Sequence, residues 1–341
     1  MPLTTRERFV RTFTFQPVDR LPVTEWAPWW WDQTLRRWQG EGLPAELYPS
    51  NYNDMDAHAA IRTHFGLDDH RVFWFRGIRP DAPMPADHNR GPVTDLDSYQ
   101  RLKTHFYPEV AHLRPMLQRW AKLQQDGDAA VWFYFEGFFW FPRTLFGIEE
   151  HLFAFADQPE LMQVMNQDIL AYSQRVLEFV SGILRPDWVV LAEDMSYNKG
   201  PMLSKGMFDD FMAPYYRQWV RHARQHTDLL LVDSDGRVDD IVPWMLEVGM
   251  DGFQPLERMA GVDVAALRRQ HPRLRLVGGF DKRVMSQGEA AIRAEFERLL
   301  PVMRQGGYIP STDHQTPPEV SLADYRLYVR LQQEYARQAA S

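Results

Sequence analysis

The chain has 341 residues, of which 45% are hydrophobic and 25% are charged, and its formal net charge at pH 7 is −8. These proportions are typical of a soluble globular protein, and no basic stripe offsets the negative charge to favour a nucleic acid partner. Cysteine is absent, which excludes disulfides and thiolate sites, so any metal would be held by His, Asp or Glu. No apolar run approaches the roughly 18 residues of a membrane span, and the N-terminus lacks a signal-peptide pattern, so we expect a cytoplasmic protein.

The first part of the chain predicts several helical stretches and a few separated strands. Thr4 and Glu7 have the spacing of a capping box before an apolar face, so we predict a helix over residues 5–14. We predict the first strand over residues 21–26, and an irregular, aromatic-rich insertion or lid over residues 27–70. Further strands are expected at residues 71–75 and 130–135, and helical patterns at residues 97–125 and 145–182.

From residue 187 onward, apolar strand-like runs alternate strictly with helical patterns. Strands are predicted at 187–192, 228–232, 252–256, 274–278 and 307–310, and the helices that follow them at 207–226, 238–248, 263–270, 287–305 and 321–338. Strict alternation predicts parallel strands with helical crossovers. Five such units, with room for three more upstream, favour a closed (β/α)8 TIM barrel over an open sheet, as a single domain over residues 1–341.

Aromatic residues are concentrated in two stretches of the sequence. Six of the 12 tryptophans lie within the first 80 residues, and a second run extends over residues 132–141. This density is expected either in a core or homodimer contact, or in the wall of an apolar or aromatic substrate pocket. We take Trp26 and Tyr134 as candidate substrate-binding residues of such a wall.

Acidic residues follow the carboxyl end of each of the five later strands. In repeated β/α folds catalytic groups lie where strands end, so this pattern predicts an enzyme with one shared site. The residues are Glu193 and Asp194, Asp233 and Asp235, Glu257, Asp281, and Asp313 with the adjacent His314.

Asp233 and Asp235 form the sharpest of these features. Alternate residues of an extended segment point the same way, so the two carboxylates can face one spot. They could bind a cation or form an acid–base pair, or one of them could cap the helix near Val238. His314 is a candidate metal ligand or proton shuttle, although a structural role is equally compatible. Together, Asp233, Asp235 and His314 would suit a divalent cation such as zinc or manganese.

The remaining candidates form a rim around this centre. Lys199 lies in a polar loop after Asp194 that could orient a substrate. Arg143 is a positively charged residue within a stretch of aromatic residues. Glu257 and Asp281 complete the predicted rim. Neither a dinucleotide fingerprint nor a P-loop nor a nucleophile elbow occurs in the sequence.

Several motifs carry a resemblance to a known family over nearly the whole length. The sequence is similar to the uroporphyrinogen decarboxylase superfamily, whose fold is a (β/α)8 barrel. The matching segments are Arg6-Glu7-Arg8-Phe9, Gln16-Pro17-Val18-Asp19-Arg20-Leu21-Pro22-Val23, Glu193-Asp194-Met195, Gly200-Pro201-Met202-Leu203-Ser204, Asp235-Gly236, Pro255-Leu256-Glu257, Gly278-Gly279-Phe280-Asp281-Lys282 and Gly306-Gly307-Tyr308-Ile309 to Asp313-His314.

The resemblance implies one of two chemistries. Decarboxylases of the family carry an arginine-rich segment after the first strand, whereas residues 23–31 contain no arginine here. Corrinoid-linked methyltransferases hold zinc through an H-x-C pair and a later Cys, and those positions look like Asp233, Asp235 and His314.

The leading hypothesis is a methyltransferase or demethylase that acts on a small methylated compound of apolar or aromatic character. A divalent metal would act as a Lewis acid, Glu193 or Asp194 would handle the proton, and a corrinoid protein would accept the methyl group. Two alternatives are a decarboxylase of a porphyrinogen-like or other carboxylated substrate, with Arg143, Lys199 and Arg283 converging on it, and a non-catalytic binding barrel.

Overall fold

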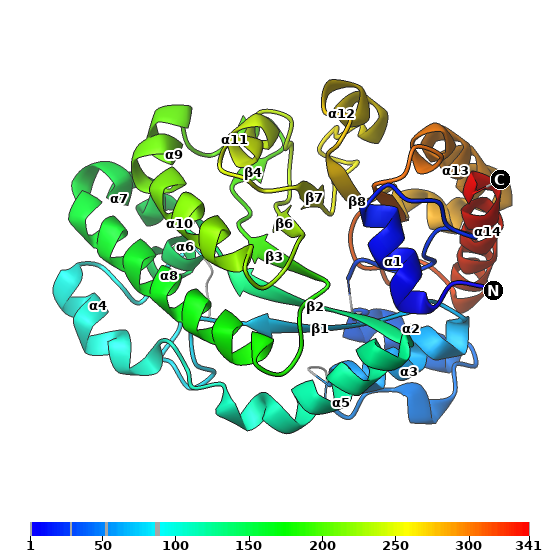
Figure 1. Cartoon of the computed structure of the whole chain (residues 1–341), viewed down its shortest axis with the longest axis horizontal. Coiled ribbons are helices and arrows are strands. Elements are labelled where there is room, and N and C mark those ends of the chain that lie inside the picture. The colour runs from blue at the N-terminus through cyan, green and yellow to red at the C-terminus, as the bar shows by residue number, and fades with distance from the viewer. Residues whose placement is uncertain (1, 28, 52–53, 86–88, 341) are drawn as a thin grey trace. The chain divides into compact units, whose positions relative to one another are not determined.

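The computed structural model describes residues 2–27, 29–51, 54–85 and 89–340, and the chain divides into two compact units. The first unit comprises Met1–Val72, Lys122–Trp132 and Gly252–Ser341, and the second comprises Phe73–Ala121 and Phe133–Asp251. Both units combine helices with strands (Figure 1). The prediction of a single domain over the whole chain stays a prediction.

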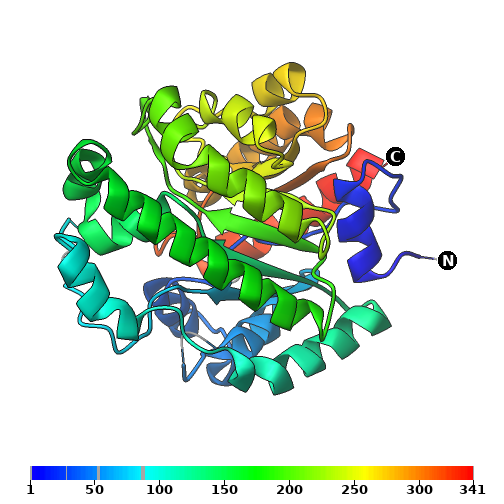
Figure 2. The ribbon, with the colours of Figure 1, turned by 60° about the vertical axis from the view of Figure 1, so that its left-hand side comes forward.

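The second unit is built on the strand order β1-β2-β3-β6. Strands β3 and β6 are parallel, with Ala192 opposite Asp233, so both strands end at the same edge. The long helix α8 packs beside α10 (Figure 2). The elements of this unit are α4 (Leu96–Leu102), η2 (Lys103–His105), η3 (Ala111–Leu113), α6 (Trp140–Phe146), α7 (Ile148–Asp157), α8 (Pro159–Ser181), β3 (Trp188–Ala192), β4 (Ser196–Tyr197), β5 (Gly200–Pro201), α9 (Lys205–Phe211), α10 (Ala213–Ala223), β6 (Leu230–Asp233) and α11 (Ile241–Glu247).

The first unit contains the strand order β7-β8-β9, and both pairs are parallel. Helices α13 and α14 pack together. Its elements are α1 (Thr5–Phe13), α2 (Asp32–Gly40), η1 (Ala45–Leu47), α3 (Met55–Phe65), β7 (Gly252–Gln254), α12 (Val264–Gln270), β8 (Arg275–Phe280), η4 (Lys282–Gln287), α13 (Glu289–Met303), β9 (Tyr308–Thr312) and α14 (Leu322–Ala340). Three elements pass from one unit to the other: β1 (Asp69–Phe75), α5 (Arg114–Asp126) and β2 (Ala129–Glu136).

The predicted closed eight-stranded barrel is wrong in one respect, because residues 21–26 do not form a strand among the described residues. This extended segment is held mainly through side chains. Val23 donates its N–H to the Asp68 carboxylate at 2.8 Å, and Trp26 donates to the Ser311 hydroxyl at 3.1 Å. Since side chains occupy these backbone groups, no ladder forms. The protein is therefore an α/β fold of the TIM-barrel type with seven strands in its two parallel runs.

The prediction of an irregular insertion over residues 27–70 is also wrong, because α2 and α3 lie within it. Asp54 caps α3 by accepting the N–H groups of Asp56 and Ala57, and Gly66 ends the helix in the left-handed conformation. Both are ordinary helix signals that the high content of Trp, Pro and Asn obscured. Residues 28 and 52–53 of this stretch lie outside the described residues.

Most other predicted elements are confirmed within a few residues. Thr4 and Glu7 form the expected capping box at the start of α1. The predicted helix over 207–226 is two helices, α9 and α10, which meet at Met212 just before Pro214. Most of the aromatic residues are buried in the core. They include Trp132, Phe133, Tyr134 and Phe135 of β2, a strand in which every residue is buried. No helix in the described ranges is long and apolar enough to cross a membrane.

Candidate active site

Three carboxylates converge at one edge of the second unit. Oxygen atoms of Asp194, Asp233 and Asp235 all lie within 4.8 Å of one another, and the three side chains are partly buried. Asp233 ends β6, and Asp194 lies two residues beyond the last residue of the adjacent parallel strand β3. The sequence prediction that Asp233 and Asp235 face one spot is thus matched, and Asp194 is the third member of this group, which we call the carboxylate cluster.

Tyr134 ties the carboxylate cluster to β2. Its hydroxyl donates a hydrogen bond of 2.5 Å to Asp233 Oδ2, and its side chain is almost fully buried. Burial raises the pKa of Tyr134 well above its usual value, and the negative charge of Asp233 raises it further. The phenol therefore keeps its proton over the physiological pH range and acts as a donor toward Asp233.

Asp194 is held in place by contacts with Arg143 and Asp235. Arg143 Nη1 donates to its backbone carbonyl at 2.8 Å, and Arg143 Nη2 lies 3.5 Å from its carboxylate. Its Oδ1 accepts the backbone N–H of Asp235 at 3.1 Å. The backbone of Asp194 has a φ of 42°, a conformation that is costly for a non-glycine residue and that clusters at functional sites.

Aromatic side chains lie against this cluster. The ring of Trp74 stacks on Tyr134 with centroids 5.1 Å apart, and it contacts Trp140 at 5.7 Å. Arg76 lies 4.6 Å from the Trp74 ring, and Arg143 lies 4.7 Å from the Trp140 ring. Neither Trp74 nor Trp140 is among the site residues predicted from the sequence; Trp74 is the penultimate residue of β1, and Trp140 is the first residue of α6.

Glu193 has a different environment from Asp194. Its carboxylate is fully buried and accepts the backbone N–H groups of Phe138, Phe139 and Trp140 at 2.8–3.1 Å, and also the Tyr216 hydroxyl. Burial raises its pKa to about 7 against these hydrogen bonds. These contacts anchor the loop before α6. Lys199, by contrast, is exposed in the turn between β4 and β5.

The other predicted site residues belong to the first unit. The ring of His314 meets Trp26 edge to face, with centroids 6.3 Å apart. Asp281 pairs with Arg283 at 2.6 Å, and Glu257 is partly buried. The neighbouring Asp313 is buried and accepts the Arg258 N–H at 3.0 Å, and burial raises its pKa. That His314, Trp26, Glu257 and Asp281 share one site with the carboxylate cluster stays a prediction.

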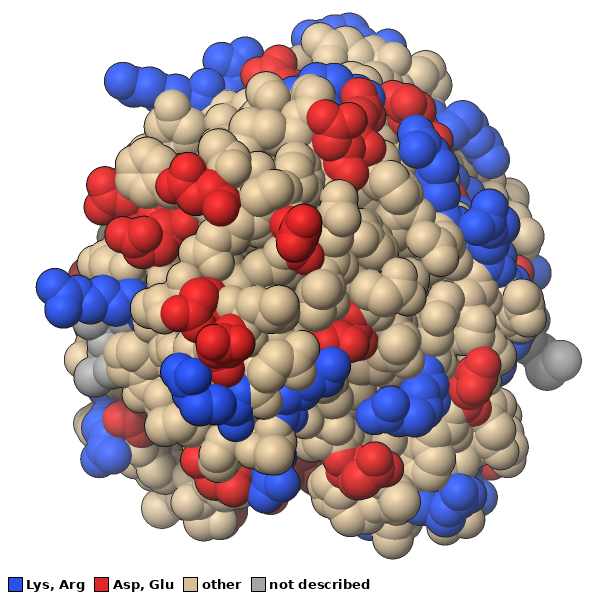
Figure 3. All heavy atoms as spheres, turned by 90° about the vertical axis from the view of Figure 1, so that its left-hand side faces the viewer, with Lys and Arg blue, Asp and Glu red and all other residues tan. Residues whose placement is uncertain are grey.

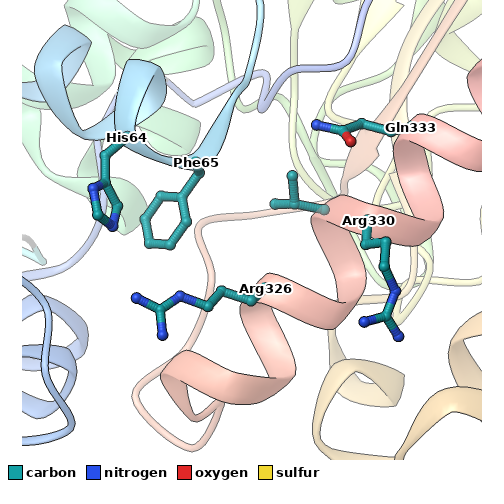
Figure 4. A pocket seen from close by; sticks show the side chains of 6 residues that line it. His64, Phe65, Arg326, Arg330 and Gln333 are labelled. Carbon is teal, nitrogen blue, oxygen red and sulfur yellow. The ribbon is translucent and has the colours of Figure 1, made fainter.

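Two surface features complete the description. A pocket of the first unit lies between α3 and α14 (Figure 4), and none of the predicted site residues lines it. Its lining residues are His64, Phe65, Arg326, Val329, Arg330 and Gln333. On the face drawn in Figure 3, acidic and basic side chains are interspersed, so this face carries no broad region of a single charge.

Comparisons with known proteins agree with these features. The family model of uroporphyrinogen decarboxylase (URO-D) matches residues 172–335. A methyltransferase from Methanosarcina mazei has a similar structure with a TM-score of 0.64 and 17% sequence identity, over 98% of this chain and 99% of that one. At this identity the likeness shows the fold.

A second solved structure is more remote. It is described as a vitamin-B12 independent methionine synthase from Listeria monocytogenes, and it matches with a TM-score of 0.46 and 12% identity over 93% of this chain and 97% of that one. Among curated protein sequences there is no significant match. The family match over residues 172–335, the motifs at the strand ends and the parallel α/β architecture together support assignment of the chain to the uroporphyrinogen decarboxylase superfamily.

Proposed function

We propose that this protein is a methyltransferase or demethylase of its superfamily, acting on a small methylated compound of apolar or aromatic character. The observation that carries the proposal is the carboxylate cluster of Asp194, Asp233 and Asp235, which lies against the aromatic side chains of Tyr134 and Trp74. Carboxylates supply charge and proton chemistry, while the rings supply apolar surface for a substrate.

The donor set of the carboxylate cluster fits a hard divalent cation. Three carboxylates offer oxygen atoms within 4.8 Å of one another, and the sequence has no thiolate to offer. A set of oxygen donors suits manganese, whereas zinc sites more often use thiolate or imidazole ligands. A cation bound there would polarise the oxygen or nitrogen from which the methyl group departs. The assignment of His314 as a further ligand rests on the family resemblance.

The chain's own residues would orient and protonate the substrate. Tyr134 donates a hydrogen bond to Asp233 Oδ2, and Arg143 fixes the position of Asp194. With Asp233 and Asp235 as cation ligands, Asp194 is the carboxylate that would exchange a proton with the substrate, while the hydrogen bonds of Glu193 suit it to supporting the loop. A corrinoid protein as methyl acceptor is part of the proposal because the methyltransferase branch of the superfamily uses one.

A direct test combines metal binding with methyl transfer. Purified protein should bind Mn²⁺ stoichiometrically in calorimetry, and Asp235→Asn should weaken this binding about 10-fold or more. Asp239→Asn is the matched control, because Asp239 lies nearby in sequence and pairs with Arg237. His314→Ala tests the fourth residue separately. Methyl transfer would be followed spectroscopically with cob(I)alamin as acceptor and a panel of methoxylated aromatic compounds as donors.

The proposal fails if the purified protein holds no stoichiometric metal and Asp235→Ala leaves methyl transfer intact. A decarboxylase would instead release carbon dioxide from carboxylated compounds. Two of the three cations predicted to bind such a substrate are engaged, since Arg143 contacts Asp194 and Arg283 pairs with Asp281, while Lys199 is exposed. A non-catalytic barrel would have carboxylates closed to solvent, whereas Asp233 and Asp235 are only partly buried.

A further inference from the structure

Three guanidinium groups surround one phenylalanine ring in the first unit. The guanidinium carbons of Arg273, Arg268 and Arg275 lie 4.1, 5.1 and 5.6 Å from the centroid of the Phe15 ring. Arg268 comes from α12, Arg273 from the loop after it, and Arg275 is the first residue of β8. The group, which we call the Phe15 arginine cluster, thus lies at the amino end of β8, whereas the acids of this unit follow the carboxyl ends.

Arg268 is the least satisfied member of the Phe15 arginine cluster. Its side chain is buried, with the residue only 3% exposed, and its Nη1 donates to the Pro272 carbonyl at 2.9 Å. Its Nε and Nη2 atoms are buried without a hydrogen-bond partner in the described structure. Buried donors of this kind are rare in native proteins, because each unpaired group keeps its full desolvation cost.

The charges around Arg268 increase this cost. Burial, together with repulsion from the neighbouring Arg273 and Arg275, lowers the pKa of Arg268 to about 10. No carboxylate within the described ranges forms an ion pair with Arg268 or Arg273. Native proteins normally pair a buried charge with an opposite one. The cluster therefore lacks the negative group that would balance it.

The Phe15 ring and Arg275, which would surround a negatively charged ligand, are held rigidly. Phe15 has a φ of 58°, which is costly for a bulky aromatic residue. Gly307 donates to the Thr12 carbonyl at 2.7 Å, and a Cβ on Gly307 would lie only 2.1 Å from the Phe15 ring. Arg275 Nε also donates to the Phe13 carbonyl at 3.3 Å. The ring and Arg275 are thus held before any ligand arrives, which reduces the entropy cost of binding.

We propose that the Phe15 arginine cluster is a binding site for a phosphate group, either as inorganic phosphate or as part of a phosphate ester. The two unpaired N–H atoms of Arg268 form a planar fork that matches two phosphate oxygens, and Arg273 adds a second, exposed cation. The site is independent of the carboxylate cluster and of the proposed methyl transfer. The pocket of Figure 4 has a weaker claim, because Arg330 lies 3.6 Å from Glu289 there.

The test is phosphate binding by the full chain in a low-salt buffer. Inorganic phosphate should raise the Tm of the wild-type protein by about 2 °C or more, and calorimetry should give a saturable isotherm. Arg268→Met should abolish both effects and, without phosphate, should be at least as stable as wild type, since it removes an unpaired buried charge. Arg269→Met, on the same helix but exposed, is the matched control and should respond like wild type.

Two further measurements keep the proposal open to refutation. If Arg268→Met does not fold, the exposed Arg273→Gln should still weaken phosphate binding about five-fold or more. Pyrophosphate should bind more tightly than phosphate if the natural ligand is a phosphate ester, and no more tightly if it is the free ion. The proposal is wrong if sodium chloride at matched ionic strength gives the same rise in Tm, or if Arg268→Met keeps the phosphate response.

Discussion

The hydroxyl of Tyr134 donates a hydrogen bond of 2.5 Å to a carboxylate oxygen of Asp233, from a position 99 residues earlier in the chain. The two residues come from β2 and β6, which flank β3 in the strand order. Because Tyr134 is buried and keeps its proton, it limits the directions that the Asp233 carboxylate can face. A positioned carboxylate is what a metal or proton-transfer site requires.

We expect Tyr134→Phe to disturb the carboxylate cluster without unfolding the protein. Loss of the hydroxyl frees Asp233 to rotate, so Mn²⁺ affinity measured by calorimetry should fall about 10-fold. Tyr215→Phe is the control, because that hydroxyl donates to the backbone carbonyl of Gln163, away from the carboxylate cluster. Unchanged Mn²⁺ affinity in Tyr134→Phe would show that the hydrogen bond does not position Asp233.

Glu193→Ala should cost far more stability than removal of an exposed glutamate. The substitution leaves the buried N–H groups of Phe138, Phe139 and Trp140 without their acceptor, which we expect to cost about 3 kcal/mol or more in urea denaturation. Glu193→Gln keeps one acceptor oxygen and should cost less. Glu150→Ala, exposed on α7, should change stability by less than about 0.5 kcal/mol. Equal costs for Glu193→Ala and Glu150→Ala would contradict the anchoring role.

Glu25 should make stability depend on pH. It is buried beside Thr312 and Tyr325, and burial raises its pKa from 4.5 to about 7. Between these values the folded state binds more protons than the unfolded state, so stability falls as pH rises through the window. For this fully buried carboxyl group, the pKa shift lowers the free energy of unfolding by on the order of 3 kcal/mol above about pH 8.

Glu25→Gln removes this titration. Its free energy of unfolding, relative to wild type, should therefore rise between about pH 4.5 and about pH 8, when measured by urea denaturation at each pH. The exposed Glu46→Gln should show a constant difference from wild type over the same range. A constant difference for Glu25→Gln as well would mean that Glu25 does not titrate in this window.

Gly137→Ala should destabilise the second unit. A Cβ at this position would lie 1.8 Å from Glu193 Oε1, so the buried carboxylate would have to move from its three N–H donors. Overpacking of this kind costs about 1–3 kcal/mol, which a decrease in Tm would reveal. Gly40→Ala has no atom within 4 Å of the new Cβ and should be neutral or slightly stabilising. A Tm for Gly137→Ala within error of wild type would refute the close contact.

The sequence predicted the local features of the fold well. Capping signals and apolar periodicity depend on neighbours along the chain, so the helix after Thr4 and the later alternation of strands and helices were predictable. The segment over residues 21–26 was not, because its hydrogen bonds go to Asp68 and Ser311, which are remote in sequence. The helices α2 and α3 are not apparent from composition, because the high content of Trp, Pro and Asn in this stretch obscures the local signals of Asp54 and Gly66.

By itself, the sequence determined that carboxylates follow the ends of parallel strands, because strand polarity and side-chain alternation are local properties. It therefore predicted one shared site, with Asp233, Asp235 and His314 at its centre and Asp194 on its rim. Only the tertiary structure distinguished Glu193, buried among backbone donors, from the adjacent Asp194 in the carboxylate cluster. It also brought Tyr134 and Trp74 to that cluster and left Arg268 buried without a counter-charge, since burial and pairing depend on residues far apart in the chain.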